Sequence, residues 1–166
     1  EYARYWMHNG FLTVDAEKMS KSIGNVLLLH DLVQHMPGEV VRWALLSAHY
    51  RQPLDWNQSL LEQSRATLDK IYRTILDARP LARQAEHEKK FFYRPEGVVD
   101  VAEFNRQHAR VGLEELVQHL HNDLNTPGAL SSLSRMSSEL RFAILEHDAL
   151  RACDLFEALR EAADIL

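Results

Sequence analysis

The stretch Phe11-Leu12-Thr13-Val14-Asp15-Ala16-Glu17-Lys18-Met19-Ser20-Lys21-Ser22-Ile23-Gly24-Asn25 decides the beginning of the fold. Its first four residues are aromatic, aliphatic and β-branched and follow the turn-prone pair Asn9-Gly10, which predicts a short strand over 11–14. Residues 16–25 show no hydrophobic period and end on Gly-Asn, which predicts a loop. We expect the loop to be poorly ordered until a ligand holds its lysines.

The residue types in this loop suit a polyphosphate ligand. Ammonium groups neutralise phosphate oxygens as point charges, and serine hydroxyls add hydrogen-bond donors. Gly24 lets the backbone turn close to a ligand. The simpler interpretation is a solvated loop with two ordinary lysines, and residue types alone favour it because short motifs give false matches.

Beyond the loop, apolar residues recur at three- and four-residue steps, which predicts helices. They are expected at about 29–35, 39–49, 57–79, 101–123, 126–144 and 148–166, with a turn over 51–55. Pro80 is expected to end the third helix, and Thr126, followed by Pro127, to cap the fifth. At Leu28 a side-chain cap is impossible, so the first helix must be capped from elsewhere or begin later.

Short connections between amphipathic helices predict an antiparallel bundle. The expected fold class is mainly α, with a short strand and the loop followed by this helical bundle. We divide the chain into a loop-bearing region (1–56), a long connecting helix with a linker (57–98) and the bundle (99–166). Residues 81–98 are polar and read as the linker, with Phe91-Phe92-Tyr93 packing back on the body.

Composition limits the function classes. The net charge of −5 argues against indiscriminate nucleic-acid binding, although residues 1–95 carry 13 basic and 11 acidic residues while the remainder is acidic. The lone Cys153 excludes an internal disulfide and a thiolate-rich metal site, and it reads as a core residue. No apolar run is long enough to cross a bilayer. We expect a cytoplasmic protein, and a chain beginning at Glu1 reads as a piece of something longer.

The string Lys18-Met19-Ser20-Lys21-Ser22 resembles the signature loop of class I aminoacyl-tRNA synthetases. Three further blocks are similar to cysteinyl-tRNA synthetases and occur in that family's order, namely Tyr5-Trp6-Met7-His8-Asn9-Gly10-Phe11, Leu45-Leu46-Ser47-Ala48-His49-Tyr50-Arg51-Gln52-Pro53-Leu54 and Asn122-Asp123-Leu124-Asn125-Thr126-Pro127. Together the similar regions cover most of the chain.

The resemblance implies that cysteine and ATP form cysteinyl-adenylate, whose cysteinyl group then passes to tRNA(Cys). It makes Lys21 the principal ATP contact and Lys18 its support. Met19 would be an apolar anchor, and Ser20 and Ser22 would either bond phosphate or cap the loop. The family's other nucleotide motif and its zinc ligands are absent from this sequence, and the scattered histidines give no metal site. The piece is therefore expected to be inactive alone, and the enzyme to be a monomer.

Several alternatives stay open at this stage. The enzyme could be the related cysteine ligase of mycothiol biosynthesis, or the chain could be a non-catalytic helical module that binds RNA or protein. His49-Tyr50-Arg51 could contact a tRNA stem or lie at a helix C-terminus. Trp43 and Trp56 are expected in the core. A basic row on the long helix could follow phosphates or form a salt-bridged face; it consists of Arg65, Lys70, Arg73, Arg79 and Arg83.

Overall fold

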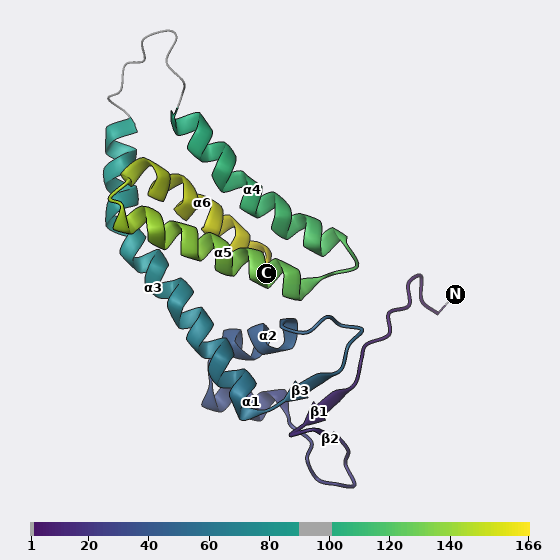
Figure 1. Ribbon diagram of the computed structural model, residues 1–166. Coiled ribbons are helices and arrows are strands. Elements are labelled where there is room, and N and C mark those ends of the chain that lie inside the picture. Colours follow the sequence, from purple (N-terminus) through teal and green to yellow (C-terminus); the bar gives the residue numbers. More distant parts are fainter. Residues whose placement is uncertain (1, 90–100) are drawn as a thin grey trace.

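One long helix connects the two parts of the molecule in the computed structural model, which describes residues 2–89 and 101–166. This helix, α3 (Gln58–Lys89), has a small sheet and two short helices near its start, and three helices pack along its second half (Figure 1). The other elements are β1 (Leu12–Val14), β2 (Glu17–Lys18), α1 (Leu29–His35), α2 (Gly38–Leu46), β3 (Leu54–Trp56), α4 (Val101–His121), α5 (Thr126–Leu145) and α6 (Ala149–Ile165). The predicted mainly α fold class is confirmed.

The expectation of a single short strand was wrong. A three-stranded sheet has the order β2-β1-β3, in which β1 and β2 are antiparallel and β1 and β3 are parallel. The expected turn over 51–55 therefore ends in a strand. β3 forms because Leu54 and Trp56 turn to one face and pack on α2, in a small core around Val41 and Ala44. Strands of two or three residues are too short for a periodic pattern to reveal.

Pro80 does not end the long helix, which continues to Lys89. Residues 81–89 of the expected linker are thus helical, while the rest of it, with Phe91-Phe92-Tyr93, lies outside the described residues. The helix persists because Ala82 and Ala85 are buried against Cys153 of α6. This packing outweighs the hydrogen bond that the proline ring removes.

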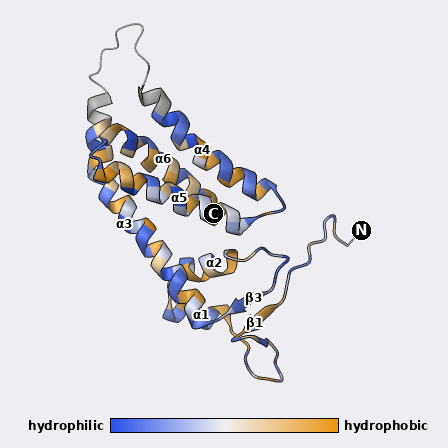
Figure 2. Ribbon diagram, viewed as in Figure 1, coloured by the Kyte–Doolittle hydropathy of each residue, from blue (hydrophilic) through white to orange (hydrophobic). Residues whose placement is uncertain are grey.

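The bundle core lies between α3, α4, α5 and α6, and the apolar faces of these helices turn toward one another (Figure 2). Leu116, Leu140 and Leu159 are fully buried there, and burying each such side chain contributes about 1.5–3 kcal/mol. Alanines on α5 and α6 allow the helices to approach closely. Cys153 is 1% exposed, which confirms it as a core residue.

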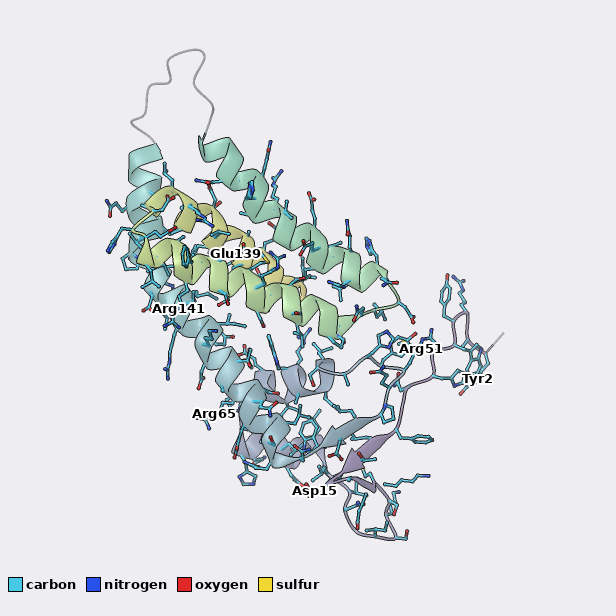
Figure 3. The ribbon with its side chains drawn as sticks, viewed as in Figure 1. Tyr2, Asp15, Arg51, Arg65, Glu139 and Arg141 are labelled. Carbon is cyan, nitrogen blue, oxygen red and sulfur yellow. The ribbon has the colours of Figure 1, made fainter. Side chains whose placement is uncertain are left out.

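The two tryptophans that were expected in the core differ in burial. Trp56 is buried beneath the sheet, as predicted, whereas Trp43 is only half-buried and packs against the edge of the bundle core. Tyr2 lies in an N-terminal segment that extends away from the helices (Figure 3). The rings of Tyr2 and Tyr5 are both exposed.

The helix caps refine the predicted boundaries. Asn125, not Thr126, caps α5, because its side chain accepts a hydrogen bond from the backbone N–H of Gly128 at 3.1 Å. Asp148 caps α6 in the same way. α1 begins directly after Leu28 without a side-chain cap, and none of its residues is buried.

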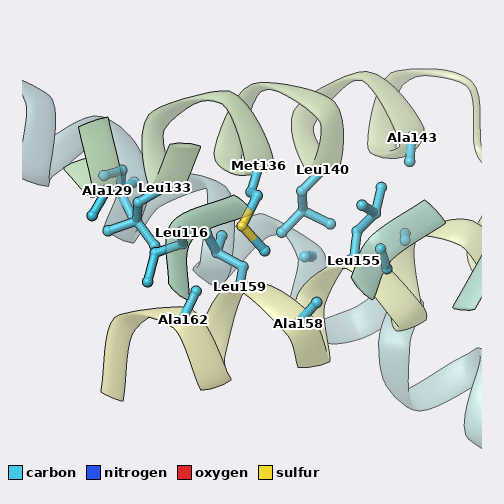
Figure 4. Close-up of a cluster of buried hydrophobic side chains, with 14 residues drawn as sticks. Leu116, Ala129, Leu133, Met136, Leu140, Ala143, Leu155, Ala158, Leu159 and Ala162 are labelled. Carbon is cyan, nitrogen blue, oxygen red and sulfur yellow. The ribbon is translucent and has the colours of Figure 1, made fainter. Parts of the chain in front are cut away.

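The close-up of the bundle core shows how α5 and α6 meet across it, with Met136 between Leu116 and Leu140 (Figure 4). Methionine adapts to an irregular gap that a branched side chain would not fill. Among the residues that the structure describes, no helix is long and apolar enough to cross a membrane.

Candidate functional site

A β-hairpin presents the lysine-bearing loop. β1 and β2 are joined by Asp15 and Ala16, whose φ angles of 49° and 64° place both in the left-handed region. Such a two-residue turn fits the right-handed twist of a hairpin, but residues with a Cβ adopt it at a cost. Asp55 of β3 holds the turn in place, because its carboxylate accepts hydrogen bonds from the Ala16 N–H at 2.7 Å and from the Thr13 hydroxyl at 2.6 Å.

Asp55 also ties the hairpin to the start of α3. Its second carboxylate oxygen accepts a hydrogen bond from the Asn57 side chain at 2.9 Å, and Asn57 in turn accepts one from the N–H of Leu60 at 2.8 Å in the first turn of α3. The hydroxyl of Thr13, followed by the amide of Asn57 and the N–H of Ala16, holds the pKa of Asp55 below its usual value. The negative charge is therefore favoured where it fixes the hairpin.

Hydrogen bonds within the loop close its backbone, and the expected disorder of the loop without a ligand stays a prediction. The Asn25 side chain accepts a hydrogen bond from the Ser20 N–H at 2.8 Å and donates one to the carbonyl of Lys18 at 3.3 Å. Ser20 accepts from the N–H of Ile23 at 3.3 Å, and Gly24, with φ of 77°, closes the turn.

The candidate ligand-binding side chains project from this closed backbone. Lys18 and Lys21 are exposed, and within the described chain neither ammonium has a hydrogen bond or an ion pair. Lys18 lies over the ring of Phe11 at 5.2 Å, because it pairs with Thr13 and so shares a face with Phe11 two residues earlier. Met19 is half-buried. The Ser20 and Ser22 hydroxyls are 3.2 Å apart.

A second contact joins the loop-bearing region to the bundle. Gly10 donates its N–H to the Tyr50 carbonyl at 2.6 Å, and a Cβ at Gly10 would come within 2.2 Å of the Gln52 carbonyl oxygen. Only glycine fits this approach. Tyr50 and Arg51 then reach Asp123 beyond the end of α4, where the carboxylate accepts from the Tyr50 hydroxyl at 2.6 Å and from Arg51 Nε at 2.7 Å.

Charge and hydrogen bonding reinforce one another at Asp123. Hydrogen bonds from Arg51 and Tyr50 lower the pKa of the Asp123 carboxyl to about 2. The same bonds raise the pKa values of Tyr50 and Arg51. His49 completes the contact, with its Nε2 3.0 Å from the carbonyl oxygen of Asp123.

The structure corrects one interpretation of His49-Tyr50-Arg51, the helix C-terminus, while contact with a tRNA stem stays a prediction. α2 ends at Leu46, so these residues lie beyond the helix, and their polar atoms are directed to Asp123. Sequence reasoning had singled out the blocks around Arg51 and Asp123 separately and missed that they pair. The sequence signal that could have indicated this pair was the carboxylate of Asp123 in one block and the basic residues beside Tyr50 in the other.

The structure also bears on the basic row on α3, which was interpreted either as following phosphates or as a salt-bridged face. Arg65, Lys70 and Arg73 are exposed, and in the described part of the chain they form no ion pair with Glu62, Asp69 or Asp77. In the part of the chain that the structure describes, these three members of the row therefore do not form a salt-bridged face. Among the described residues, no group of three or more His, Cys, Asp or Glu side chains could hold a metal ion.

Comparisons with known proteins agree with this architecture. Residues 1–66 match the family model for the class I (C) tRNA synthetase catalytic domain. The cysteine–tRNA ligase of Phenylobacterium zucineum is 47% identical over 148 residues, which are 89% of this chain and 27% of that protein. The cysteine–tRNA ligase of Caulobacter vibrioides is 41% identical over 164 residues, which are 99% of this chain and 30% of that protein.

A solved structure is similar in fold. The leucyl enzyme (LeuRS) in the ternary LeuRS–tRNA–LeuAMS complex of Agrobacterium radiobacter superposes with a TM-score of 0.72 at 17% identity, covering 93% of this chain and 20% of that one. The chain spans less than a third of the length of the curated relatives that it matches. The identity of 41–47% extends along nearly all of this chain's residues, so the chain is similar throughout to a segment of cysteinyl-tRNA synthetases, which are class I enzymes.

Proposed function

We propose that this chain is the part of a cysteine–tRNA ligase that engages the phosphates of ATP and faces tRNA(Cys). The whole enzyme would activate cysteine as cysteinyl-adenylate and then transfer the cysteinyl group to the tRNA. The observation that carries the proposal is the loop over 18–25, whose backbone is closed by Asn25 and Ser20 while its two ammonium groups are exposed and unpaired within the described chain.

On this proposal we assign a role to each loop residue. Lys21 is free to follow charge as it builds on the departing pyrophosphate, which lowers the barrier to adenylate formation. Lys18 supports it from the hairpin. Met19 anchors the loop as a half-buried side chain, and Ser20 caps it by accepting from Ile23. Ser22 is the hydroxyl closest to Lys21 in sequence and could donate to a phosphate oxygen.

The names of the similar proteins support ATP, cysteine and tRNA(Cys) as the substrates of the longer enzyme, for which we also propose a monomeric state and a cytoplasmic location. The fold-similar leucyl enzyme was solved with tRNA bound. We propose a zinc site only for the part of the longer enzyme outside this chain, because the described residues offer no set of metal ligands. Accordingly, we assign no step to zinc here, and we expect this chain alone to catalyse no ATP–pyrophosphate exchange.

The test replaces Lys21 in the intact enzyme and measures the two half-reactions separately by pre-steady-state kinetics. Lys21→Ala is expected to slow adenylate formation by roughly 10²–10³, about 3 kcal/mol, while ATP binding weakens much less. Transfer from preformed cysteinyl-adenylate to tRNA(Cys) should change far less, because pyrophosphate has already left.

Two variants make this test specific. Lys21→Arg should recover only part of the rate, since a planar guanidinium replaces a compact point charge. Ser22→Ala removes a neighbouring hydroxyl without removing charge and should have a smaller effect. Equal slowing of both half-reactions would show that Lys21 is a structural residue instead. Adenylate formation that never leads to charged tRNA would point to a ligase with another acceptor.

A further inference from the structure

The carboxylate of Asp123 fixes one side of residues 49–52, which we call the Arg51 segment. It accepts two hydrogen bonds from Arg51, from Nε to one oxygen at 2.7 Å and from Nη2 to the other at 3.0 Å. The oxygen bonded to Nη2 also accepts the Tyr50 hydroxyl at 2.6 Å. A guanidinium that meets both oxygens of a carboxylate is fixed in direction as well as in distance. The Arg51 segment is therefore aligned against the bundle.

The Arg51 segment is bonded on its other side to the chain that leads into β1. The carbonyl of Tyr50 accepts the N–H of Gly10 at 2.6 Å. Just beyond the segment, Leu54 donates its N–H to the carbonyl of Phe11 at 3.0 Å. The backbones lie so close that a Cβ added at Gly10 would come within 2.2 Å of the Gln52 carbonyl oxygen. Because close-packed groups transmit displacements, a shift of the Arg51 segment must move Gly10 as well.

Gly10 leads directly to the lysine-bearing hairpin. The next residue, Phe11, precedes β1, and the ammonium of Lys18 lies 5.2 Å from the centre of its ring. Lys18 also pairs with Thr13 across the two strands of the hairpin. Lys21 follows three residues later, in the loop that Lys18 opens. The place of both lysines therefore depends on Gly10, and through it on the Arg51 segment.

The turn that carries Asp123 is itself fixed to the bundle. Leu124 donates its N–H to the carbonyl of Leu120 at 3.1 Å, and Asn125 donates its own to the carbonyl of His119 at 3.0 Å. The turn is thus bonded to the last turn of α4, while the side chain of Asn125 caps α5. Asp123 is therefore a fixed point of the bundle to which the Arg51 segment is attached.

We propose that Asp123 is a positioning residue for adenylate formation, because it fixes the Arg51 segment and thereby the place at which the hairpin presents its lysines to ATP. This role, which rests on the proposed function of the loop, involves no contact between Asp123 and a substrate. The Asp123 side chain is 48% exposed, and ion pairs at such positions contribute modestly to stability. A small displacement of a catalytic group, in contrast, slows a reaction strongly.

The first experiment measures adenylate formation by the intact enzyme at saturating ATP. Asp123→Ala is expected to slow it by roughly 10–100-fold, while the ATP dissociation constant changes by less than about twofold. Asp123→Glu keeps the carboxylate and should recover part of the rate. The matched control is Glu115→Gln, which breaks a half-exposed ion pair with Arg135 between α4 and α5 and should leave the rate unchanged.

A double-mutant cycle separates positioning from a general loss of structure. If Asp123 acts through the loop, Asp123→Ala should have a much smaller effect in a Lys21→Ala background, because the principal ammonium to be placed is gone. Losses that simply multiply would overturn the proposal, since they would show that Asp123 supports the enzyme in some other way. Lys21→Ala alone tests the proposed function, which would fail if this change left adenylate formation unaltered.

The second experiment does not depend on activity. Hydrogen exchange of this chain, followed by NMR, reports how firmly the Gly10 N–H is held on the Tyr50 carbonyl. Asp123→Ala should speed the exchange of that amide about tenfold, while the amide of Leu140 in the bundle core keeps its rate. Glu115→Gln should change neither amide.

Two results of the exchange experiment would overturn the proposal. An unchanged rate at Gly10 would show that the bond is held without Asp123, and equal acceleration at Gly10 and Leu140 would show a general loss of stability. Either result would stand even if Lys21→Ala slowed adenylate formation as expected. The positioning role of Asp123 and the proposed function of the loop can therefore fail separately.

Discussion

Asn25 and Asp55 hold the lysine-bearing loop through its backbone, which leaves the loop's own side chains available. Asn25 uses both ends of its amide, one on the Ser20 N–H and one on the Lys18 carbonyl. Asp55 accepts a hydrogen bond from the N–H of Ala16. This bond offsets the conformational strain of the left-handed φ angles of Asp15 and Ala16, which are not glycines. At the scale of single residues, the loop's shape and its chemistry are thus carried by different side chains.

Asn25→Ala should open the loop without unfolding the protein. It removes the acceptor of the Ser20 N–H, a bond worth about 1 kcal/mol, so that amide should exchange with solvent roughly five- to tenfold faster. Hydrogen exchange followed by NMR measures this. Asn25→Asp keeps the acceptor and is the matched control. If the Ser20 amide exchanged equally fast in all three proteins, the bond would not be holding the loop.

At the scale of elements, α3 is the main connection between the two cores. Its first turns pack on the small sheet through Leu61, and Ile71 and Ala78 belong to the bundle core. Tyr72 adds a hydrogen bond to Glu39 of α2 at 2.7 Å, which raises the pKa of the tyrosine. A helix that is packed at both ends tolerates Pro80 in its interior.

Replacing that proline should stabilise the protein. Pro80→Ala restores a backbone donor in the middle of α3 and relieves the ring's clash with the preceding turn, for a gain of about 1–2 kcal/mol after the greater freedom of the unfolded chain is subtracted. Urea unfolding followed by circular dichroism gives the difference. Arg79→Ala, at the neighbouring exposed position, should change the free energy of unfolding far less. A destabilising effect of Pro80→Ala would mean that the ring itself packs usefully.

At the scale of the whole molecule, the Asp123 contact is one of the places, together with Trp43 of α2, where the loop-bearing region meets the bundle away from α3. Tyr50 and Arg51 approach from one side, and the turn between α4 and α5 presents Asp123 and Leu124, both with left-handed φ angles of 53° and 52°. Gly10, Tyr50 and Asp123 lie far apart in sequence. One hydrogen bond links Gly10 to the carbonyl of Tyr50, and another links the hydroxyl of Tyr50 to Asp123.

This contact predicts a specific pH dependence of stability. The folded state lowers the pKa of Asp123 to about 2, so its contribution is fully present above the unfolded-state value near 4 and is lost as the pH falls from about 4 to about 2. Urea unfolding over that range should show the difference between the unmodified protein and Asp123→Asn shrinking toward zero. A difference that stayed constant with pH would exclude an ionised Asp123 as the cause.

At alkaline pH the stability changes in the opposite direction, because it falls as the pH rises. The hydrogen bond to Asp123 raises the pKa of Tyr50, so its contribution is complete below about pH 10 and is lost as the pH rises through the folded-state value. Tyr50→Phe should remove this alkaline loss while keeping the acid one. The same unfolding experiment, extended above pH 9, checks it.

The amino-acid sequence by itself determined the helices of the bundle and the position of the loop, because hydrophobic period and turn residues are local signals. Thus the apolar stripes of α5 and α6 and the break at Gly24-Asn25 were recognisable without a structure. The tertiary structure alone decided that β2 and β3 exist, that α3 continues through Pro80, and that Arg51 meets Asp123. Short strands gain their stability from neighbours distant in sequence, a helix interrupted by proline persists only through packing, and an ion pair across more than seventy residues leaves no local pattern.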